Sequence, residues 1–251
     1  MSKENLLVCA LGSYETMANV TVICTDKTGT LTQTKTSVVA STIGVQAKFV
    51  RKPEENDNSA SNDDGGGPNT KDLVDLANLN TDLPRPVMDL LNAAIVINST
   101  AFEDVDPESG DESASLGFAK ELGWPNYEDT RNSANIVHMI PFSSDRKYMA
   151  CVVRLRGGSH RLYAKGASEI LARNCARHVI TTSFNAAEIE TAPIREPEED
   201  NISQAITLYA SQTLRTIALC YRDFPSWPPK GVRFLDNDEA SKCITVPVFD
   251  D

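Results

Sequence analysis

One tract without large apolar side chains limits where this chain of 251 residues can build a core. From about Lys52 to Thr70 the sequence is KPEENDNSASNDDGGGPNT, with no aromatic residue and no Leu, Ile, Val or Met. Such a tract cannot bury enough surface to offset the entropy lost on ordering, so we expect a disordered insertion. We therefore divide the chain into residues 1–40, a connector at residues 41–72 and a main domain at residues 73–251.

The main domain alternates helix-like and strand-like runs. Helices are expected over residues 86–98, 116–122, 168–177 and 202–212, the last one capped by Asn201. Strands are expected over residues 135–140, 148–155, 161–164 and 215–222, and Gly157-Gly158-Ser159 is typical of a hairpin turn between two of them. The sequence therefore predicts an α+β fold, with an antiparallel sheet flanked by helices.

Charge and cysteine usage narrow the function classes. The 24 Lys and Arg residues stand against 35 Asp and Glu residues, a net charge of -11, which argues against nucleic acids and acidic membrane surfaces as partners. No run approaches the ~20 apolar residues of a membrane-spanning helix. The six cysteines lie mostly in apolar runs and lack metal-ligand spacing, which favours buried, reduced thiols in a cytosolic compartment.

The run ICTDKTGTLT, at residues 23–32, carries the clearest chemistry. The β-branched residues 20–25 predict a buried strand, which would place Asp26 just beyond its carboxyl end. Lys27, Thr28 and the backbone N–H groups near Gly29 can surround a phosphoryl group with positive charge and hydrogen-bond donors. Asp26 is thus a candidate nucleophile that forms an aspartyl-phosphate, although Asp-x-x-Gly alone is also an ordinary turn.

The stretch DKTGTLT resembles the phosphorylation signature of the P-type ATPases, whose phosphorylation domain has a haloacid-dehalogenase-like Rossmann fold. Related phosphatases usually carry a second Asp two positions after the nucleophile, where this sequence has Thr28. The resemblance implies catalysis by Asp26, Lys27 and Thr28, with Asp26 and Thr28 also holding Mg²⁺. It further implies that residues 1–40 are an incomplete segment of that Rossmann domain. A soluble aspartate-nucleophile phosphatase is disfavoured by Thr28.

Three further motifs follow in the order found in that family. PFSSDRK at residues 141–147 resembles the family segment whose Phe stacks on adenine. YAKGASE at residues 163–169 resembles the segment whose Lys lines the adenine pocket. LRTIAL at residues 214–219 resembles the segment whose Arg reaches the phosphates of ATP. Each motif alone is compatible with ordinary core or surface residues. Together they imply an ATP-binding set, namely Glu112, Phe142, Lys147, Lys165, Gly166 and Arg215.

The wording of these motifs resembles most the calmodulin-regulated branch of plasma-membrane and vacuolar calcium-transporting pumps. The resemblance implies the cytosol-facing catalytic part of an ATP-driven calcium pump, with ATP and Mg²⁺ as cofactors, calcium as the transported ion and calmodulin as a partner of the full-length protein. We expect the chain to be a fragment whose membrane helices lie outside it, and expect it to bind ATP but to be inactive alone. The alternative is a non-catalytic nucleotide-binding or interaction module.

Overall fold

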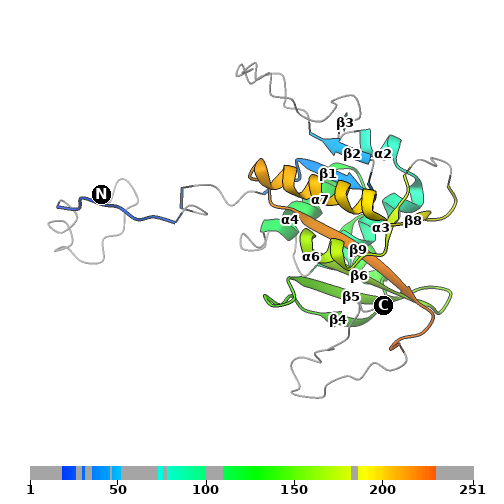
Figure 1. Ribbon diagram of the computed structural model, residues 1–251. Coiled ribbons are helices and arrows are strands. Elements are labelled where there is room, and N and C mark those ends of the chain that lie inside the picture. Colours follow the sequence, from blue (N-terminus) through cyan, green and yellow to red (C-terminus); the bar gives the residue numbers. More distant parts are fainter. Residues whose placement is uncertain are drawn as a thin grey trace. The chain divides into compact units, whose positions relative to one another are not determined.

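The computed structural model describes residues 19–26, 30–31, 36–45, 47–51, 73–75, 78–99, 110–181 and 186–229, without the side chains of residues 73–74 and 110–113 (Figure 1). The chain divides into two compact units, Met1–Lys35 and Thr36–Asp251. The tract expected to be disordered, residues 52–70, lies outside the described residues. The three domain boundaries stay a prediction.

In the first unit, the prediction of a buried strand over residues 20–25 is wrong. Residues 20–26 are irregular, and Val22 and Ile23 are 73% and 84% exposed. A strand is stable only beside another strand that satisfies its N–H and C=O groups. None of the described strands pairs with this segment, so the described structure offers its β-branched residues no sheet in which to be buried.

The second unit contains a four-stranded sheet in the order β4-β5-β6-β9 (Figure 1). Its strands are β4 (Ile136–Ile140), β5 (Tyr148–Arg154), β6 (His160–Ala167) and β9 (Ile217–Phe224). All neighbouring pairs are antiparallel. The predicted hairpin is confirmed: Leu155 N donates to Ser159 O, and Gly158 takes the left-handed φ of +84° that favours glycine. The α+β prediction with an antiparallel sheet is also confirmed.

Both faces of this sheet are covered, because alternate side chains of its strands point to opposite sides. On one face, Leu162 and Cys220 pack with Leu171 of α6 (Ser168–Arg173). On the other face, Cys151 and Tyr163 pack with residues of α3 (Arg85–Val96). The central strand β5 is consequently a nearly continuous buried run from Met149 to Val153.

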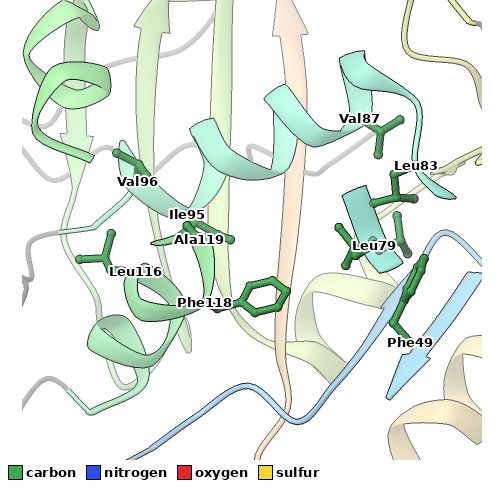
Figure 2. Close-up of a cluster of buried hydrophobic side chains, with 10 residues drawn as sticks. Phe49, Leu79, Leu83, Val87, Ile95, Val96, Leu116, Phe118 and Ala119 are labelled. Carbon is green, nitrogen blue, oxygen red and sulfur yellow. The ribbon is translucent and has the colours of Figure 1, made fainter. Parts of the chain in front are cut away.

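A second core lies beside a smaller sheet. β1 (Ala40–Ile43) pairs antiparallel with β2 (Ala47–Val50), which pairs parallel with β3 (Leu73–Asp75). Figure 2 shows Phe49 of β2 beside Leu79 and Leu83. Leu79 is the first residue of α2 (Leu79–Asp82), and Leu83 follows this helix. α3 and α4 (Gly110–Glu121) supply most of the remaining side chains of this core. Strands thus occupy part of the region expected to be a connector.

The remaining elements are α5 (Tyr127–Ser133), β7 (Arg177–Val179), β8 (Thr191–Pro193) and α7 (Glu196–Ser211). The predicted cap at Asn201 is wrong, since α7 begins at Glu196 and the Asn201 side chain donates to Pro197 O inside the helix. Pro197 and the acidic first turn favour the earlier start, because proline suits the first helical turn and carboxylates favour the positive end of the helix dipole. α6 ends at Arg173, four residues before the predicted end. None of the helices in the described ranges combines the length and the apolarity that a membrane crossing requires.

Candidate functional site

Three segments of the chain meet at one end of the four-stranded sheet. β5 begins at Tyr148 opposite Gly166, and β6 ends at Ala167 opposite Ile217, where β9 begins. Because neighbouring strands are antiparallel, the turn before β5, the end of β6 and the segment before β9 share this end. It therefore gathers five of the six predicted ATP-binding residues: Phe142, Lys147, Lys165, Gly166 and Arg215.

The turn before β5 is held by its own motif residues. Lys147 N donates to Ser143 O at 2.7 Å, and Lys147 adopts a left-handed φ of 63°. The guanidinium of Arg146 donates to Pro141 O at 2.6 Å and lies over the Tyr148 ring. This turn leaves Phe142 with 59% of its surface exposed. An exposed aromatic face of this kind can stack on a planar heterocycle.

Gly166 joins that turn to β6 and has no room for a side chain. A Cβ added at Gly166 would lie 2.3 Å from Lys147 O and 2.5 Å from Tyr148 Cβ. The next residue, Ala167, donates its N–H to Lys147 O at 2.9 Å. Gly166 is therefore the position at which the two backbones touch, and its structural role is to hold the turn against the strand.

Lys165 is a charged residue in a buried place, with 6% of its surface exposed. Lys165 lies opposite Met149 of the neighbouring strand β5, and its side chain belongs to the sheet face that α3 covers. Burial raises the pKa of the neighbouring Cys151 to about 12, and the positive charge of Lys165 opposes that rise. A partly desolvated ammonium acts more strongly on a nearby anion than one in bulk water does.

The segment before β9 places Arg215 at the same end. After α7, Thr213 takes a left-handed φ of 61°, and Leu214 N donates to Tyr209 O at 3.0 Å, so the chain turns sharply toward β9. The Thr216 hydroxyl lies 2.6 Å from the hydroxyl of Ser168, the first residue of α6. This hydrogen bond ties the residue after Arg215 to the helix that follows Lys165, while Arg215 itself stays exposed.

The remaining predicted site residues are Asp26, Lys27, Thr28 and Glu112. Lys27 and Thr28 lie outside the described residues, and the Glu112 side chain is not described although its backbone belongs to α4. Asp26 is exposed in the first unit, where the Thr25 hydroxyl donates to its backbone carbonyl. An exposed carboxylate fits Mg²⁺, which takes one or two carboxylates together with phosphate and water oxygens. Within the described ranges, no group of three or more His, Cys, Asp or Glu side chains forms a metal site.

The sequence did not identify the residues whose contacts hold the segments of the candidate site together. Ser168, Thr216 and Tyr148 fix the segments relative to one another through the hydrogen bond and the backbone contact described above. The Ser and Thr lie 48 positions apart, and only the strand register brings them together. No local signal in the sequence identifies such a pair.

The prediction of buried cysteines is only partly confirmed, and the reduced state of the thiols stays a prediction. Four cysteines in the described residues are free thiols: Cys151 is buried, Cys175 and Cys220 are half-buried, and Cys24 is exposed. Cys9 and Cys243 lie outside the described residues. Cys24 is exposed because the segment around it is not part of a sheet.

Comparison with known proteins supports one family. The family described as P-type ATPase, cytoplasmic domain N, matches residues 86–246. Calcium-transporting ATPase 2 of Cryptococcus neoformans var. grubii is 49% identical over 96% of this chain and 18% of its own length. Calcium-transporting ATPase 2 of Schizosaccharomyces pombe is 34% identical over 100% of this chain and 20% of its own length. Plasma membrane calcium-transporting ATPase 4 of Bos taurus is 31% identical over 100% of this chain and 19% of its own length.

This chain therefore spans about a fifth of the length of these relatives. The family match covers the four-stranded sheet, its two covering helices and every described residue of the sheet end. The order of the motifs, the antiparallel fold and the match over residues 86–246 agree, and the chain belongs to the P-type ATPase family through its cytoplasmic N domain.

Proposed function

We propose that the chain is the nucleotide-binding and phosphoryl-accepting part of an ATP-driven calcium-transporting pump. The observation that supports the proposal is that the segments carrying Phe142, Lys165 and Arg215 share one end of the sheet. An exposed aromatic ring and several cations in one place suit a ligand with a planar base and a triphosphate. Lys147, next to the Gly166 contact, adds a further exposed cation. Glu112 is proposed as an additional contact to the nucleotide.

Phosphoryl transfer is assigned to Asp26. One carboxylate oxygen attacks the γ-phosphorus of ATP in line, the bond from phosphorus to the bridging oxygen breaks, and ADP leaves as an aspartyl-phosphate forms. Lys27 and Thr28 are proposed to hold the transferred group, in a segment of haloacid-dehalogenase-like fold. Mg²⁺, held by Asp26 and Thr28, would offset the negative charge of the phosphates.

Calcium as the transported ion rests on the names of the three relatives described above, each of which is called a calcium-transporting ATPase. Regulation by calmodulin and residence in a vacuolar or plasma membrane, with this segment facing the cytosol, rest on the resemblance to the corresponding branch of pumps. Ion transport belongs to the full-length protein, of which this chain is proposed to be a part.

Nucleotide binding is tested by titrating ATP into the chain and recording the heat of binding. Phe142→Ala removes the exposed ring and Lys165→Ala removes the buried cation, and we expect each to weaken ATP affinity by about tenfold or more, since stacking and charge-assisted contacts contribute roughly 1–3 kcal/mol each. Arg154→Ala is the matched control, because Arg154 is an exposed cation opposite His160 at the other end of β5 and β6. Equal affinities for all four proteins would show that the pocket assignment is wrong.

Phosphoryl transfer is tested separately, in a full-length pump that carries this segment. With γ-labelled ATP we expect an acid-stable, hydroxylamine-sensitive label on the wild-type protein and none on Asp26→Asn. A label that persists in Asp26→Asn would contradict the assignment of the nucleophile and leave the binding proposal standing. Conversely, if the wild-type chain did not bind ATP, this would contradict the proposal of nucleotide binding and leave the assignment of Asp26 untouched.

A further inference from the structure

Two half-buried thiols lie side by side on the sheet face that α6 covers. Cys175 follows α6 and Cys220 lies in β9, 45 positions later in the chain. Their Sγ atoms are 3.2 Å apart, and both thiols are free. A disulfide has an S–S bond of about 2.05 Å, so a further approach of about 1 Å brings the two sulfurs to bonding distance.

The elements that carry the two thiols are anchored to each other. Leu171 of α6 is fully buried in the cluster that also contains Leu162 and the partly buried Cys220. The Ser168–Thr216 hydrogen bond fixes the other end of α6 to the start of β9. Cys175 N donates to Ala172 O, which continues the last turn of α6. The short sulfur–sulfur distance is therefore set by packed secondary structure rather than by a single side-chain rotamer.

The two thiols also differ in a way that suits stepwise exchange. When Cys175 is ionised, Cys220 can donate its S–H to the thiolate, and this hydrogen bond lowers the pKa of Cys175. The same interaction and burial raise the pKa of Cys220 above its ordinary value. A thiol with the lower pKa and partial exposure is the one that attacks an external disulfide, and its protonated neighbour is placed to resolve the product.

We propose that Cys175 and Cys220 form a dithiol modification site that is oxidised to an intramolecular disulfide by a low-molecular-mass disulfide. The Cys175 thiolate attacks one sulfur of oxidised glutathione, and one glutathione thiolate leaves. Cys220 then loses its proton and attacks the Cys175 sulfur, and the second glutathione leaves as a thiolate. The protein loses two electrons and two protons, and oxidised glutathione becomes two molecules of reduced glutathione.

The other thiols of the chain provide internal comparisons. Cys151 is fully buried on the opposite face of the sheet, among residues of α3, and burial raises its pKa to about 12. It is therefore not placed to compete for Cys220. Oxidation of this pair does not depend on nucleotide binding, because it depends on the distance between the two sulfurs, the anchoring of α6 to the sheet and the different acidities of the two thiols.

The test is peptide mapping by mass spectrometry of the full chain after treatment with oxidised glutathione, without prior reduction. The variant Cys9→Ser, Cys24→Ser, Cys243→Ser leaves only Cys151, Cys175 and Cys220, so that pairings elsewhere cannot obscure the result. We expect a peptide pair joined through Cys175 and Cys220, lighter by two hydrogen atoms than the two free peptides, and its disappearance after reduction with dithiothreitol. A Cys151 peptide in the linked fraction, or Cys175 that retains glutathione with Cys220 free, would overturn the proposal.

A single substitution in that background tests the order of events. Cys220→Ser removes the resolving thiol, so glutathione should remain on Cys175 as a mixed disulfide in this variant, whereas the parent variant should form the Cys175–Cys220 disulfide and carry no glutathione there. Absence of glutathione from Cys175 in Cys220→Ser would contradict the assigned roles. Because the mapping on the parent variant does not need this substitution, a folding defect in Cys220→Ser does not remove the test.

Discussion

The segments at residues 20–26 and Ile217–Phe224 are both rich in strand-forming residues, yet only the second is a strand. β9 pairs with β6 over its whole length, from His160 opposite Phe224 to Ala167 opposite Ile217. The earlier segment has no partner strand among the described residues and leaves Ile23 84% exposed. The difference lies in the neighbours, since a sheet segment obtains its hydrogen bonds and its burial from the adjacent strand.

This contrast separates two kinds of functional motif. The motifs proposed to bind ATP lie on or next to strands whose register brings their segments to one end of the sheet, so their geometry depends on residues within the described part of the chain. The motif around Asp26 has a clear sequence signature, and none of the strands in the described ranges pairs with its segment. The strength of a sequence motif therefore does not measure how well the surrounding residues fix its geometry.

The largest expected difference compares a core residue of the sheet with an exposed residue of the earlier segment. Leu162→Ala removes a side chain with 0% exposure and should lower the free energy of unfolding by about 2–5 kcal/mol. Ile23→Ala changes a side chain with 84% exposure and should change it by less than about 0.5 kcal/mol. Urea unfolding followed by circular dichroism measures both. A comparable loss for Ile23→Ala would mean that residues 20–26 are packed after all.

A second prediction concerns the contact that holds the sheet end together. Gly166→Ala places a Cβ against Lys147 O and Tyr148, and should lower the free energy of unfolding by about 1–3 kcal/mol and weaken ATP binding. Gly117→Ala is the matched control, because a Cβ there meets nothing within 4 Å and Gly117 lies within α4. Alanine is favoured over glycine in a helix, so this control should gain about 0.5–1 kcal/mol. If both substitutions changed the free energy of unfolding equally, the close backbone approach at Gly166 would make no measurable contribution to stability.

Much of the sheet could be predicted from sequence because its signals are local. The Gly157-Gly158-Ser159 turn and the apolar run of β5 define a hairpin without knowledge of any other segment. The start of α7 was predicted wrongly. Asn is a residue type that often caps helices, but here Asn201 lies inside α7, whose first turn already contains Pro197.

For the candidate site, the sequence names residues and a shared pocket, whereas the contacts that hold the segments together follow only from the structure. The motif resemblance placed Phe142, Lys165 and Arg215 in one pocket, and the register brings their segments to one end of the sheet. The role of Gly166 as a point of backbone contact depends on Lys147 and Tyr148 lying opposite it. A cross-strand contact has no signature in the sequence until the register is known.

A third, smaller effect depends on pH. Burial raises the pKa of Cys151 from an ordinary value of 9.0 to about 12, so folding favours the neutral thiol. The stability that this contributes is fully present below about pH 9 and is lost between about pH 9 and 12, reaching a loss of about 1 kcal/mol near pH 10. The comparison is with Cys151→Ala, in which this titration is absent while the tyrosines of the sheet remain. The difference in unfolding free energy between the two proteins should be constant below about pH 9 and change above it; a constant difference up to about pH 11 would contradict the prediction.

The smallest expected change in stability concerns an ion pair at the end of the sheet that lies away from the candidate site. Arg161 and Asp223 form a two-pronged ion pair, with N–O distances of 2.6 and 2.7 Å, and Arg161 is 18% exposed while Asp223 is 48% exposed. Asp223→Asn should cost about 0.5–1 kcal/mol, less at high salt, because partly exposed pairs are screened. Asp89→Asn, which disrupts the more exposed Arg85–Asp89 pair in α3, is the control and should cost less.

ATP affinity separates this end of the sheet from the other. Arg161 and Asp223 face each other at the His160–Phe224 end of the β6–β9 ladder, whereas Gly166 lies near the opposite end. Asp223→Asn should therefore leave ATP affinity unchanged even where it lowers stability, while Gly166→Ala should change both. If affinity fell in proportion to stability in both variants, nucleotide binding would depend on the integrity of the whole sheet rather than on the segments gathered at one end.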